Sequence, residues 1–456
     1  MAEQAASATK KRAATKKKRS TSTSSSKPRM RTVYIVDGAR TPNLKALDRP
    51  GPFSASDLAT QAGRSLLARL PFAPNELDEV VLGCVMPGPD EANIARIVAL
   101  RLGCGDKVPA FTVQRNCASG MQAIDSAARN IAMGRSELVL AGGTEAMSHG
   151  PILLDQAMII WLGQWAKAKT FTARIKVLSQ LRPKHFKIII GLLRGLTDPI
   201  VGLSMGQTTE NLAYRFGISR EEMDAYALMS HQRLAAAQDA GHISELETLY
   251  DHTGRFYDFD NGLRRDGDMA KLGKLRPVFD RPYGLVTAGN SAQITDGAAW
   301  LVLASEEMVK KYDLAVMGRL VDSEWAGLDP AQMGLGPVHA MTPLMKRNKL
   351  ALDDVDYFEI NEAFAGQVLA NQRAWNETDY CKQELGLSKV MGELDKERLN
   401  IDGGGVSLGH PVGASGARII LHLLHVLQRK DAKRGIASLC IGGGQGGAVL
   451  VERGAE

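Results

Sequence analysis

The stretch Val113-Gln-Arg-Asn-Cys-Ala-Ser-Gly-Met-Gln-Ala-Ile124 decides how this chain folds and where its chemistry lies. A β-favouring run ends at Asn116, and small residues lead into a pattern of apolar side chains three and four positions apart: Met121, Ile124, Ala128 and Ile131. Cys117 therefore lies at the N-terminus of a predicted helix. Unpaired backbone N–H groups and the helix dipole lower a thiol pKa there and favour the thiolate. A small buried core cysteine is the alternative, and this stretch alone leaves it open.

Short apolar strands alternate with helices on both sides of this stretch, which indicates an α/β layered fold. In the first half, strands and helices are expected at 33–36, 55–70, 79–83, 92–103 and 137–141. The second half repeats the order, with strands at 317–322, 354–360 and 436–440 and a glycine-rich turn at 402–416 that opens a helix. We infer two homologous halves whose matching loops meet at one pseudo-symmetric site.

The domain organisation follows from this repeat and from composition. We expect a disordered basic tail, an N-terminal half whose last strand returns near 297–305, an inserted loop domain with basic amphipathic helices, and a C-terminal half: 1–32, 33–154, 155–285 and 306–456.

The net charge of +6 belongs to the tail and not to the folded body. Residues 1–32 carry ten Lys or Arg and one acid, which leaves 46 basic and 49 acidic residues, a net of −3, for the rest. The tail lacks the apolar run of a secretory signal and the amphipathic pattern of a transit peptide. Nonspecific contact with nucleic acid or anionic surfaces through 1–32 is compatible with this composition, and so is a solvated tail without a specific partner.

The segment between Asp155 and Asp198 has a charge pattern of its own. It contains eight Lys or Arg and no acid. Trp161 and Trp165 lie four residues apart, and apolar side chains follow at helical spacing: Phe171, Ile175, Leu178 and Leu181. Such a segment suits contact with an anionic membrane or a phosphorylated ligand through 155–198. An ordinary amphipathic helix on a protein core, with solvated charges, fits the pattern equally well.

Composition excludes several classes of function. The five cysteines form no Cys-x-x-Cys pair, which argues against zinc sites and disulfide frameworks. Aromatic residues make up only 5%, too few for a stacking platform for single-stranded nucleic acid. No long uncharged apolar run predicts a transmembrane helix. A dinucleotide fingerprint in letters, Gly442-x-Gly-x-x-Gly447, is followed by a strand and not by a helix, so nucleotide binding is rejected there.

Four loops carry residues suited to carbon–carbon bond cleavage: Asn116-Cys-Ala-Ser-Gly, Asn361-Glu-Ala-Phe-Ala-Gly-Gln, Gly409-His-Pro-Val-Gly-Ala-Ser-Gly and Cys440-Ile-Gly-Gly-Gly-Gln-Gly-Gly. With these four motifs in this order, the chain from Val33 to Arg453 closely resembles the thiolases. These enzymes cleave 3-ketoacyl-CoA with CoA or run the reverse Claisen condensation. The resemblance implies a duplicated mixed-sheet α/β fold, layered αβαβα, with an inserted helical loop domain.

The resemblance also implies a role for each site residue. Cys117 becomes the acylated nucleophile and His410 its base, while Cys440, with an ordinary thiol pKa of about 8.5, protonates the leaving carbanion. Asn361 holds a water that forms one oxyanion hole with His410, and the backbone N–H groups of Cys117 and Gly442 form the other. Neither a metal nor a prosthetic group is implied, because CoA is a substrate.

Further matches to the thiolases concern residues that are expected to contact the substrate. Phe279 and Phe364 are expected to line the pantetheine tunnel, Ser291 to lie near CoA, and Met205 to touch the acyl end. Short-chain biosynthetic members usually carry His before that Met, and here the residue is Ser204. The basic insertion resembles that of the thiolase (beta) subunit of the trifunctional fatty-acid oxidation complex, although that subunit often has His at the position of Asn361.

The expected activity is therefore a 3-ketoacyl-CoA thiolase of fatty-acid beta-oxidation in a bacterial cytoplasm rather than a mitochondrion. The alternative within the family is an acetyl-CoA C-acetyltransferase acting mainly on acetoacetyl-CoA. The family resemblance implies a homodimer or tetramer, and the insertion suggests a hydratase/dehydrogenase partner subunit. A non-catalytic acyl-CoA carrier and a tail-driven nucleic-acid or membrane binder are competing hypotheses, of which the complete cysteine, histidine and asparagine set disfavours the first.

Overall fold

The computed structural model describes residues 30–454. The predicted disordered tail, 1–32, lies outside the described residues except for its last three. Within the described range, no helix combines the length and the apolar character needed to cross a bilayer.

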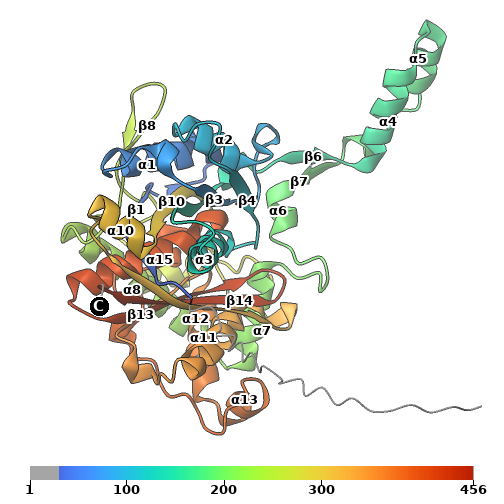
Figure 1. Cartoon of the computed structure of the whole chain (residues 1–456). Coiled ribbons are helices and arrows are strands. Elements are labelled where there is room, and N and C mark those ends of the chain that lie inside the picture. Colours follow the sequence, from blue (N-terminus) through green and yellow to red (C-terminus); the bar gives the residue numbers. More distant parts are fainter. Residues whose placement is uncertain (1–29, 455–456) are drawn as a thin grey trace, which may run out of the picture. The chain divides into compact units, whose positions relative to one another are not determined.

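One large mixed sheet forms the frame of the molecule (Figure 1). Its strands are β1 (Val33–Arg40), β2 (Leu44–Lys45), β3 (Glu79–Gly83), β4 (Ala110–Val113), β5 (Leu138–Ala146), β10 (Thr295–Ala304), β11 (Gly318–Gly327), β12 (Tyr357–Ile360), β13 (Arg434–Ile441) and β14 (Gln445–Arg453). Their spatial order is β12-β13-β14-β11-β1-β10-β5-β3-β4, with β2 beside β10. The strands near the centre are buried on both faces, which explains their continuous apolar runs.

The sheet repeats itself about its centre, as the sequence predicts. The series β1-β10-β5-β3 corresponds to β11-β14-β13-β12, and β1 and β11 pair antiparallel where the halves meet. In each series the first three strands are antiparallel neighbours, and the last pair is parallel. The loop before the helix of residues 119–132 therefore corresponds to the loop before the helix of residues 412–429 in the other half.

Helices form three layers around the two half-sheets. The central layer consists of α3 (Ser119–Ala132) and α15 (Val412–Arg429), whose apolar faces share one core with strands of both halves. On the N-terminal half, α1 (Ala55–Ala68) and α2 (Ile94–Arg101) cover the outer face, and α11 (Gly336–Arg347) and α12 (Ala365–Asn376) cover the other half. The layer order is αβαβα, as the resemblance implied.

The segment between β5 and β10 adds helices and two small ribbons. They are β6 (Ile152–Leu154), α4 (Gln156–Lys167), α5 (Phe171–Leu178), β7 (Ile188–Ile190), α6 (Gly191–Gly195), α7 (Met205–Arg215), α8 (Arg220–Asp239), β8 (Leu249–Tyr250), β9 (Phe256–Tyr257) and α9 (Met269–Gly273). The predicted start of α8 is confirmed: the Ser219 hydroxyl accepts from the Glu222 N–H, and the Glu222 carboxylate accepts from the Ser219 N–H.

The remaining elements are short. They are the helices α10 (Glu306–Tyr312), α13 (Thr378–Gln383) and α14 (Gly405–Leu408), and the 3-10 turns η1 (Pro74–Glu76), η2 (Pro89–Glu91), η3 (Met147–His149), η4 (Pro183–Phe186), η5 (Pro330–Leu335), η6 (Leu352–Asp354) and η7 (Lys396–Arg398).

Candidate active site

Cys117 lies in a tight turn between β4 and α3. Asn116 adopts a left-handed conformation with φ of 44°, which an asparagine tolerates better than most residues. The Ser119 hydroxyl fixes the turn, because it accepts from the Arg115 N–H at 2.9 Å and donates to the Asn116 carbonyl at 2.7 Å. The half-buried Cys117 thus immediately precedes the first turn of α3.

The turn between β13 and β14 meets the Cys117 turn. The Asn116 side chain donates from Nδ2 to the Gly442 carbonyl at 2.7 Å and so joins the two halves. Gly443 and Gly444 have φ of 90° and 73°, conformations that favour glycine, and they let the chain reverse directly after Gly442. The arrangement brings Cys440 and Gly442, from the C-terminal half, to the nucleophile of the N-terminal half.

The thiol pKa values differ from the sequence-based expectation. Burial raises the pKa of the Cys117 thiol, although backbone hydrogen bonds from Gly442 and from Cys117 itself act to lower it. The predicted net lowering is therefore wrong, because loss of hydration outweighs the helix N-terminus. Burial also raises the pKa of the Cys440 thiol well above the expected value of about 8.5, and the charge of Cys117 adds to this shift. Cys440 is accordingly held as a neutral thiol.

His410 lies in the turn before α15. Gly409 precedes it with φ of 91°, and a Cβ at Gly409 would fall 2.2 Å from the Thr295 methyl group. Burial, with help from the positive charge of Arg418, lowers the pKa of His410 to about 3, so the ring is neutral. Its Nδ1 lies 2.6 Å from the Ser415 hydroxyl, which donates to the Pro411 carbonyl at 3.1 Å. This pattern assigns the proton to Nδ1 and leaves Nε2 unprotonated, so Nε2 can act as a base.

Asn361 lies beside this imidazole, with its Nδ2 3.4 Å from Nε2 of His410. The side chain is buried, and its Oδ1 has no hydrogen-bond partner among the described residues. An amide oxygen only accepts hydrogen bonds, so this unpaired buried atom is suited to holding a water through one of its O–H groups. The Asn361 N–H donates to the Ser438 carbonyl at 2.9 Å, which fixes this loop to β13.

Glu362 fixes the loop that carries Asn361. Its carboxylate accepts from Tyr226 at 3.0 Å, Ser230 at 2.7 Å, Asn400 at 3.0 Å and the Val406 N–H at 3.2 Å. These partners come from α8, from the loop before α14 and from α14 itself. Glu362 thus ties the Asn361 loop to the segment that leads to His410.

The four predicted substrate residues also come together. A Cβ at Gly442 would lie 3.4 Å from the Met205 sulfur, so Met205 covers the catalytic turn. Phe279 and Phe364 contact each other edge to face, with ring centroids 5.9 Å apart. Ser291 pairs with Phe364 through a β-bridge, but its hydroxyl donates to the Thr287 carbonyl at 2.6 Å and is already engaged.

Sequence reasoning gave no role to three residues that position the site. Two of them, Asn116 and Ser415, lie within the motifs that contain Cys117 and His410. Their polar side chains in these motifs were the available signal. The third is Glu145 at the end of β5, which accepts from the N–H groups of Val85, Met86 and Gly413, each at 3.0 Å. Burial raises the pKa of Glu145 to about 7. This carboxylate joins the loop after β3 to the first turn of α15.

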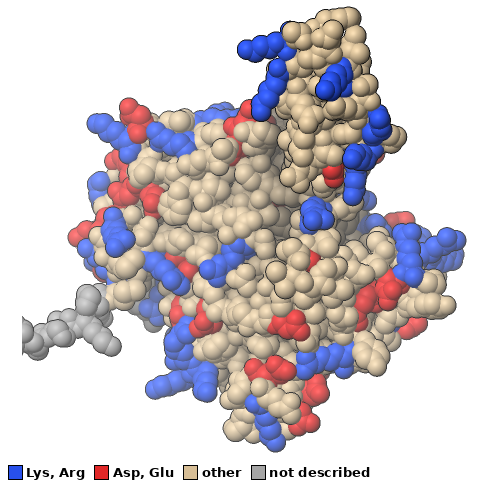
Figure 2. Space-filling view, turned by 90° about the vertical axis from the view of Figure 1, so that its right-hand side faces the viewer, with Lys and Arg blue, Asp and Glu red and all other residues tan. Residues whose placement is uncertain are grey.

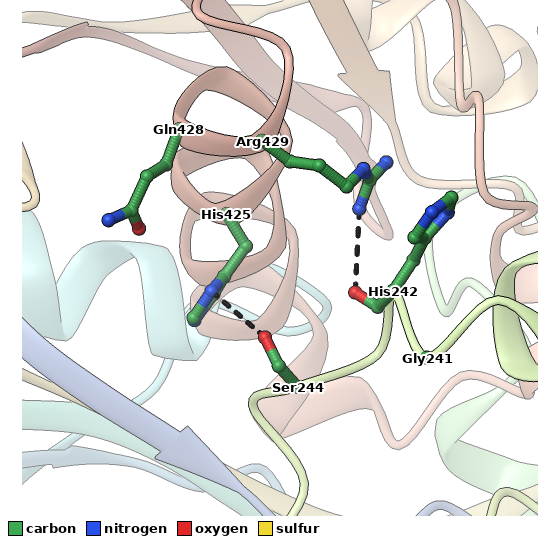
Figure 3. Close-up of a pocket in the computed structure, with 6 residues that line it drawn as sticks. All are labelled: Gly241, His242, Ser244, His425, Gln428 and Arg429. Atoms are coloured by element: carbon green, nitrogen blue, oxygen red, sulfur yellow. Dashed lines mark hydrogen bonds between the residues drawn. The ribbon is translucent and has the colours of Figure 1, made fainter.

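A cavity of about 210 Å³ lies at the opposite end of α15 (Figure 3). It is lined by Gly241, His242, Ser244, His425, Gln428 and Arg429. Two contacts cross it: Arg429 donates to the His242 carbonyl at 3.4 Å, and the Ser244 hydroxyl lies 3.3 Å from Nδ1 of His425. The cavity contains none of the predicted site residues. Across residues 30–454, no three His, Cys, Asp or Glu side chains are grouped so as to hold a metal ion.

Comparison with known proteins agrees with this geometry. Residues 33–307 match the family described as thiolase, N-terminal domain, and residues 314–453 match thiolase, C-terminal domain. The chain belongs to the thiolase family. It is accordingly an acyltransferase.

Among curated thiolases, the beta-ketoadipyl-CoA thiolase of Pseudomonas aeruginosa is 39% identical, over 93% of this chain and 99% of that protein. The mitochondrial 3-ketoacyl-CoA thiolase of Bos taurus is 38% identical, over 93% and 98%. Among solved thiolases, human mitochondrial 3-ketoacyl-CoA thiolase in complex with CoA has a TM-score of 0.79 and 36% identity, over 93% of this chain and 98% of that chain.

Proposed function

We propose that this thiolase cleaves 3-ketoacyl-CoA with CoA, in fatty-acid beta-oxidation, to acetyl-CoA and a shortened acyl-CoA. The observation that carries the proposal is the hydrogen bond from Asn116 to the Gly442 carbonyl. It brings the turn that holds Cys117 to the turn that follows Cys440. With a neutral His410 whose Nε2 is unprotonated, the site offers a nucleophile, a base and a proton donor.

In the first half-reaction, His410 takes the Cys117 proton and the sulfur attacks the 3-keto carbon. The backbone N–H groups of Cys117 and Gly442 stabilise the negative oxygen that forms. The bond between C2 and C3 then breaks, which leaves the acyl group on Cys117 and a carbanion on acetyl-CoA. Cys440 protonates that carbanion, and the proton on His410 returns to Cys440. The raised pKa of Cys440 supports this role, because it keeps the thiol protonated until the carbanion forms.

In the second half-reaction, His410 takes the thiol proton of CoA, and the CoA sulfur attacks the acyl group on Cys117. The oxyanion forms on the same carbon as before, so the backbone N–H groups of Cys117 and Gly442 stabilise it again, while the water held by Asn361, together with His410, stabilises the enolate oxygen of the acetyl-CoA carbanion in the first half-reaction. The Cys117 sulfur leaves and takes the proton from His410. The unpaired Oδ1 of Asn361, next to the imidazole, supports a bound water there. CoA serves as a substrate, and no metal or prosthetic group takes part.

Met205, Phe279, Ser291 and Phe364 are proposed to contact the substrate, Met205 at its acyl end and the two rings along the pantetheine. The edge-to-face contact of the rings and the position of Met205 over Gly442 support this assignment. The Ser291 hydroxyl donates its proton to the Thr287 carbonyl, so in a hydrogen bond with CoA it acts as the acceptor.

The second candidate is condensation of acetyl-CoA to acetoacetyl-CoA. The acetyl-CoA acetyltransferase of Allochromatium vinosum is 36% identical over 92% of this chain, which keeps this direction open. Ser204 favours cleavage, because short-chain biosynthetic members resembling this chain usually carry His at that position.

The dependence of the thiolysis rate on the acyl chain length of the substrate distinguishes degradative cleavage from condensation. Rates are measured on 3-ketoacyl-CoA substrates from acetoacetyl-CoA to long chains, with condensation of acetyl-CoA followed in parallel. A rate that rises with chain length supports the degradative assignment. Activity confined to acetoacetyl-CoA, with efficient condensation, contradicts it. In both cases, the acyl group should be found on the peptide that contains Cys117 by mass spectrometry.

We further propose a homodimer or tetramer in a bacterial cytoplasm, with a hydratase/dehydrogenase subunit as a partner. The bacterial origin of relatives such as the 3-ketoacyl-CoA thiolase of Serratia proteamaculans supports the compartment. The mass in solution, measured by light scattering with and without such a subunit, tests the assembly. Separate elution of the two proteins at every salt concentration contradicts the partner.

A further inference from the structure

The segment from Ile152 to Ile200, here called the arm, carries an unusual density of exposed apolar side chains. Of the 28 large hydrophobic side chains that are exposed among the described residues, 14 lie in the arm. They come from β6, α4, α5, β7 and the turns between them, and Phe171 is 79% exposed. Monomeric proteins rarely leave so much contiguous apolar surface uncovered without a binding partner.

The arm is also positively charged from the end of α4 onward. Its eight basic residues are Lys167, Lys169, Arg174, Lys176, Arg182, Lys184, Lys187 and Arg194, and no acid lies between Asp155 and Asp198. None of the eight forms an ion pair within residues 30–454, whereas many arginines of the catalytic body do. In Figure 2, the lobe that α4 and α5 form at the top of the view has a tan surface with blue side chains along its sides.

The two helices of the arm are organised by contacts with each other. Asp155 caps α4 and Thr170 caps α5, through bonds to backbone N–H groups at 3.0 and 3.3 Å. Trp161 donates from its indole to the Val177 carbonyl at 2.9 Å and stacks on Trp165, with centroids 5.6 Å apart. The indoles and caps therefore hold the helices together without covering their exposed apolar side chains.

The stem of the arm is fixed to the catalytic body. Strands β6 and β7 pair antiparallel, and the Gly191 N–H donates to the Pro151 carbonyl at 2.8 Å. At the far end, the Met205 N–H donates to the Leu196 carbonyl at 3.1 Å. The arm is thus joined directly to the start of α7, whose first residue covers the catalytic turn.

We infer that the arm is a docking surface for an anionic lipid bilayer. Charges of one sign beside exposed Ile, Leu and Phe side chains are typical of helices that lie in a membrane interface, where the apolar groups enter the acyl region and the cations meet anionic headgroups. The arm's two acids, Asp155 and Asp198, lie near its ends and accept hydrogen bonds from its own backbone, so the surface between them presents cations only. The docking is peripheral, since neither helix can span a bilayer.

Co-sedimentation with vesicles tests this inference on the full chain. The vesicles are pure phosphatidylcholine, or phosphatidylcholine with a third phosphatidylglycerol. The charge variant carries Lys167→Gln, Lys169→Gln, Lys176→Gln and Lys184→Gln, and the apolar variant carries Phe171→Ser and Ile175→Ser. The matched control removes four exposed, unpaired lysines of the catalytic body: Lys107→Gln, Lys382→Gln, Lys389→Gln and Lys430→Gln.

The full chain is expected to bind the anionic vesicles at least tenfold more strongly than the neutral ones. Both arm variants should lose at least tenfold in partitioning, while the control keeps at least half of it. Thiolysis of acetoacetyl-CoA without vesicles should be unchanged in all three, which shows that they fold and separates this test from that of the proposed function.

Four results would overturn the inference. One is that the full chain fails to bind anionic vesicles. A second is that the arm variants bind the vesicles as well as the control does. A third is that deletion of residues 1–29 alone abolishes binding, which assigns binding to the tail. The last is that the arm variants change only the mass of the protein in solution, which makes the arm a protein interface.

Discussion

The Ser415 hydroxyl lies 2.6 Å from Nδ1 of His410. The same oxygen donates its own proton to the Pro411 carbonyl, so it can only accept from the imidazole. This pair sets the tautomer of a buried, neutral histidine and leaves Nε2 as the basic nitrogen. Ser415 lies in the first turn of α15 and His410 in the turn before it, so the helix that fills the centre of the molecule also orients the base.

Ser415→Ala is expected to lower kcat by about tenfold to a hundredfold, because the imidazole loses the group that fixes its tautomer and orientation. KM for 3-ketoacyl-CoA should change less than twofold. The pH profile of kcat should shift as well, which a change in packing alone would not cause. Ser415→Thr, which keeps the hydroxyl, should recover most of the rate; equal loss in both variants would contradict the role.

Cys117→Ala and Cys440→Ala are expected to affect different half-reactions. Cys117→Ala should abolish acyl-enzyme formation. Cys440→Ala should slow cleavage of 3-ketoacyl-CoA by about a hundredfold or more while exchange of an acyl group onto CoA falls much less, because only cleavage needs the proton donor. Rapid-quench measurement of both half-reactions checks this. Full thiolysis by Cys117→Ala would refute the mechanism.

Glu362→Gln is expected to reduce the free energy of unfolding by about 2–4 kcal/mol, since the buried carboxylate accepts four hydrogen bonds and an amide would place a donor against donors. Denaturant unfolding measures the loss. Glu393→Gln, at an exposed position, is the control and should change stability by less than about 0.5 kcal/mol. Activity should fall in parallel, because Asn361 is the neighbouring residue.

The contacts of His422 predict that the free energy of unfolding depends on pH. It lies 2.9 Å from Glu245 and 3.1 Å from Asp402, and these carboxylates raise its pKa to about 10 despite burial. The unfolded value is about 6.5, so the folded state binds the extra proton between these pH values. The stabilisation is complete below about pH 6.5 and is lost as pH rises through about 10, with a slope of at most about 1.4 kcal/mol per pH unit.

The test compares denaturant unfolding from pH 6 to 10. His422→Gln should be less stable by about 3 kcal/mol at pH 7, because it leaves buried carboxylates without their partner, and its stability should fall less steeply above pH 7. His252→Gln, at an exposed position, should keep the wild-type pH dependence. An unchanged slope in His422→Gln would contradict the shifted pKa.

Local patterns predicted most of the fold. Apolar spacing placed α3, α15 and the strands that precede them, and the Ser219 and Glu222 pair placed the start of α8. These features depend on neighbours in the chain, so a single sequence carries them. The similarity of the two halves then predicted that matching loops meet, and the family motifs supplied the identity of the site residues.

The sequence by itself determined which side chains are available: Cys117 and His410 in the turns before two helices, and Cys440 at the end of a strand. Only the tertiary structure decided their protonation. Burial raises the thiol pKa values and lowers that of His410, because the loss of hydration depends on atoms that come from the other half of the chain. The tertiary structure also decided the hydrogen bond between Asn116 and Gly442, which are 326 positions apart in the chain, and no local pattern encodes it.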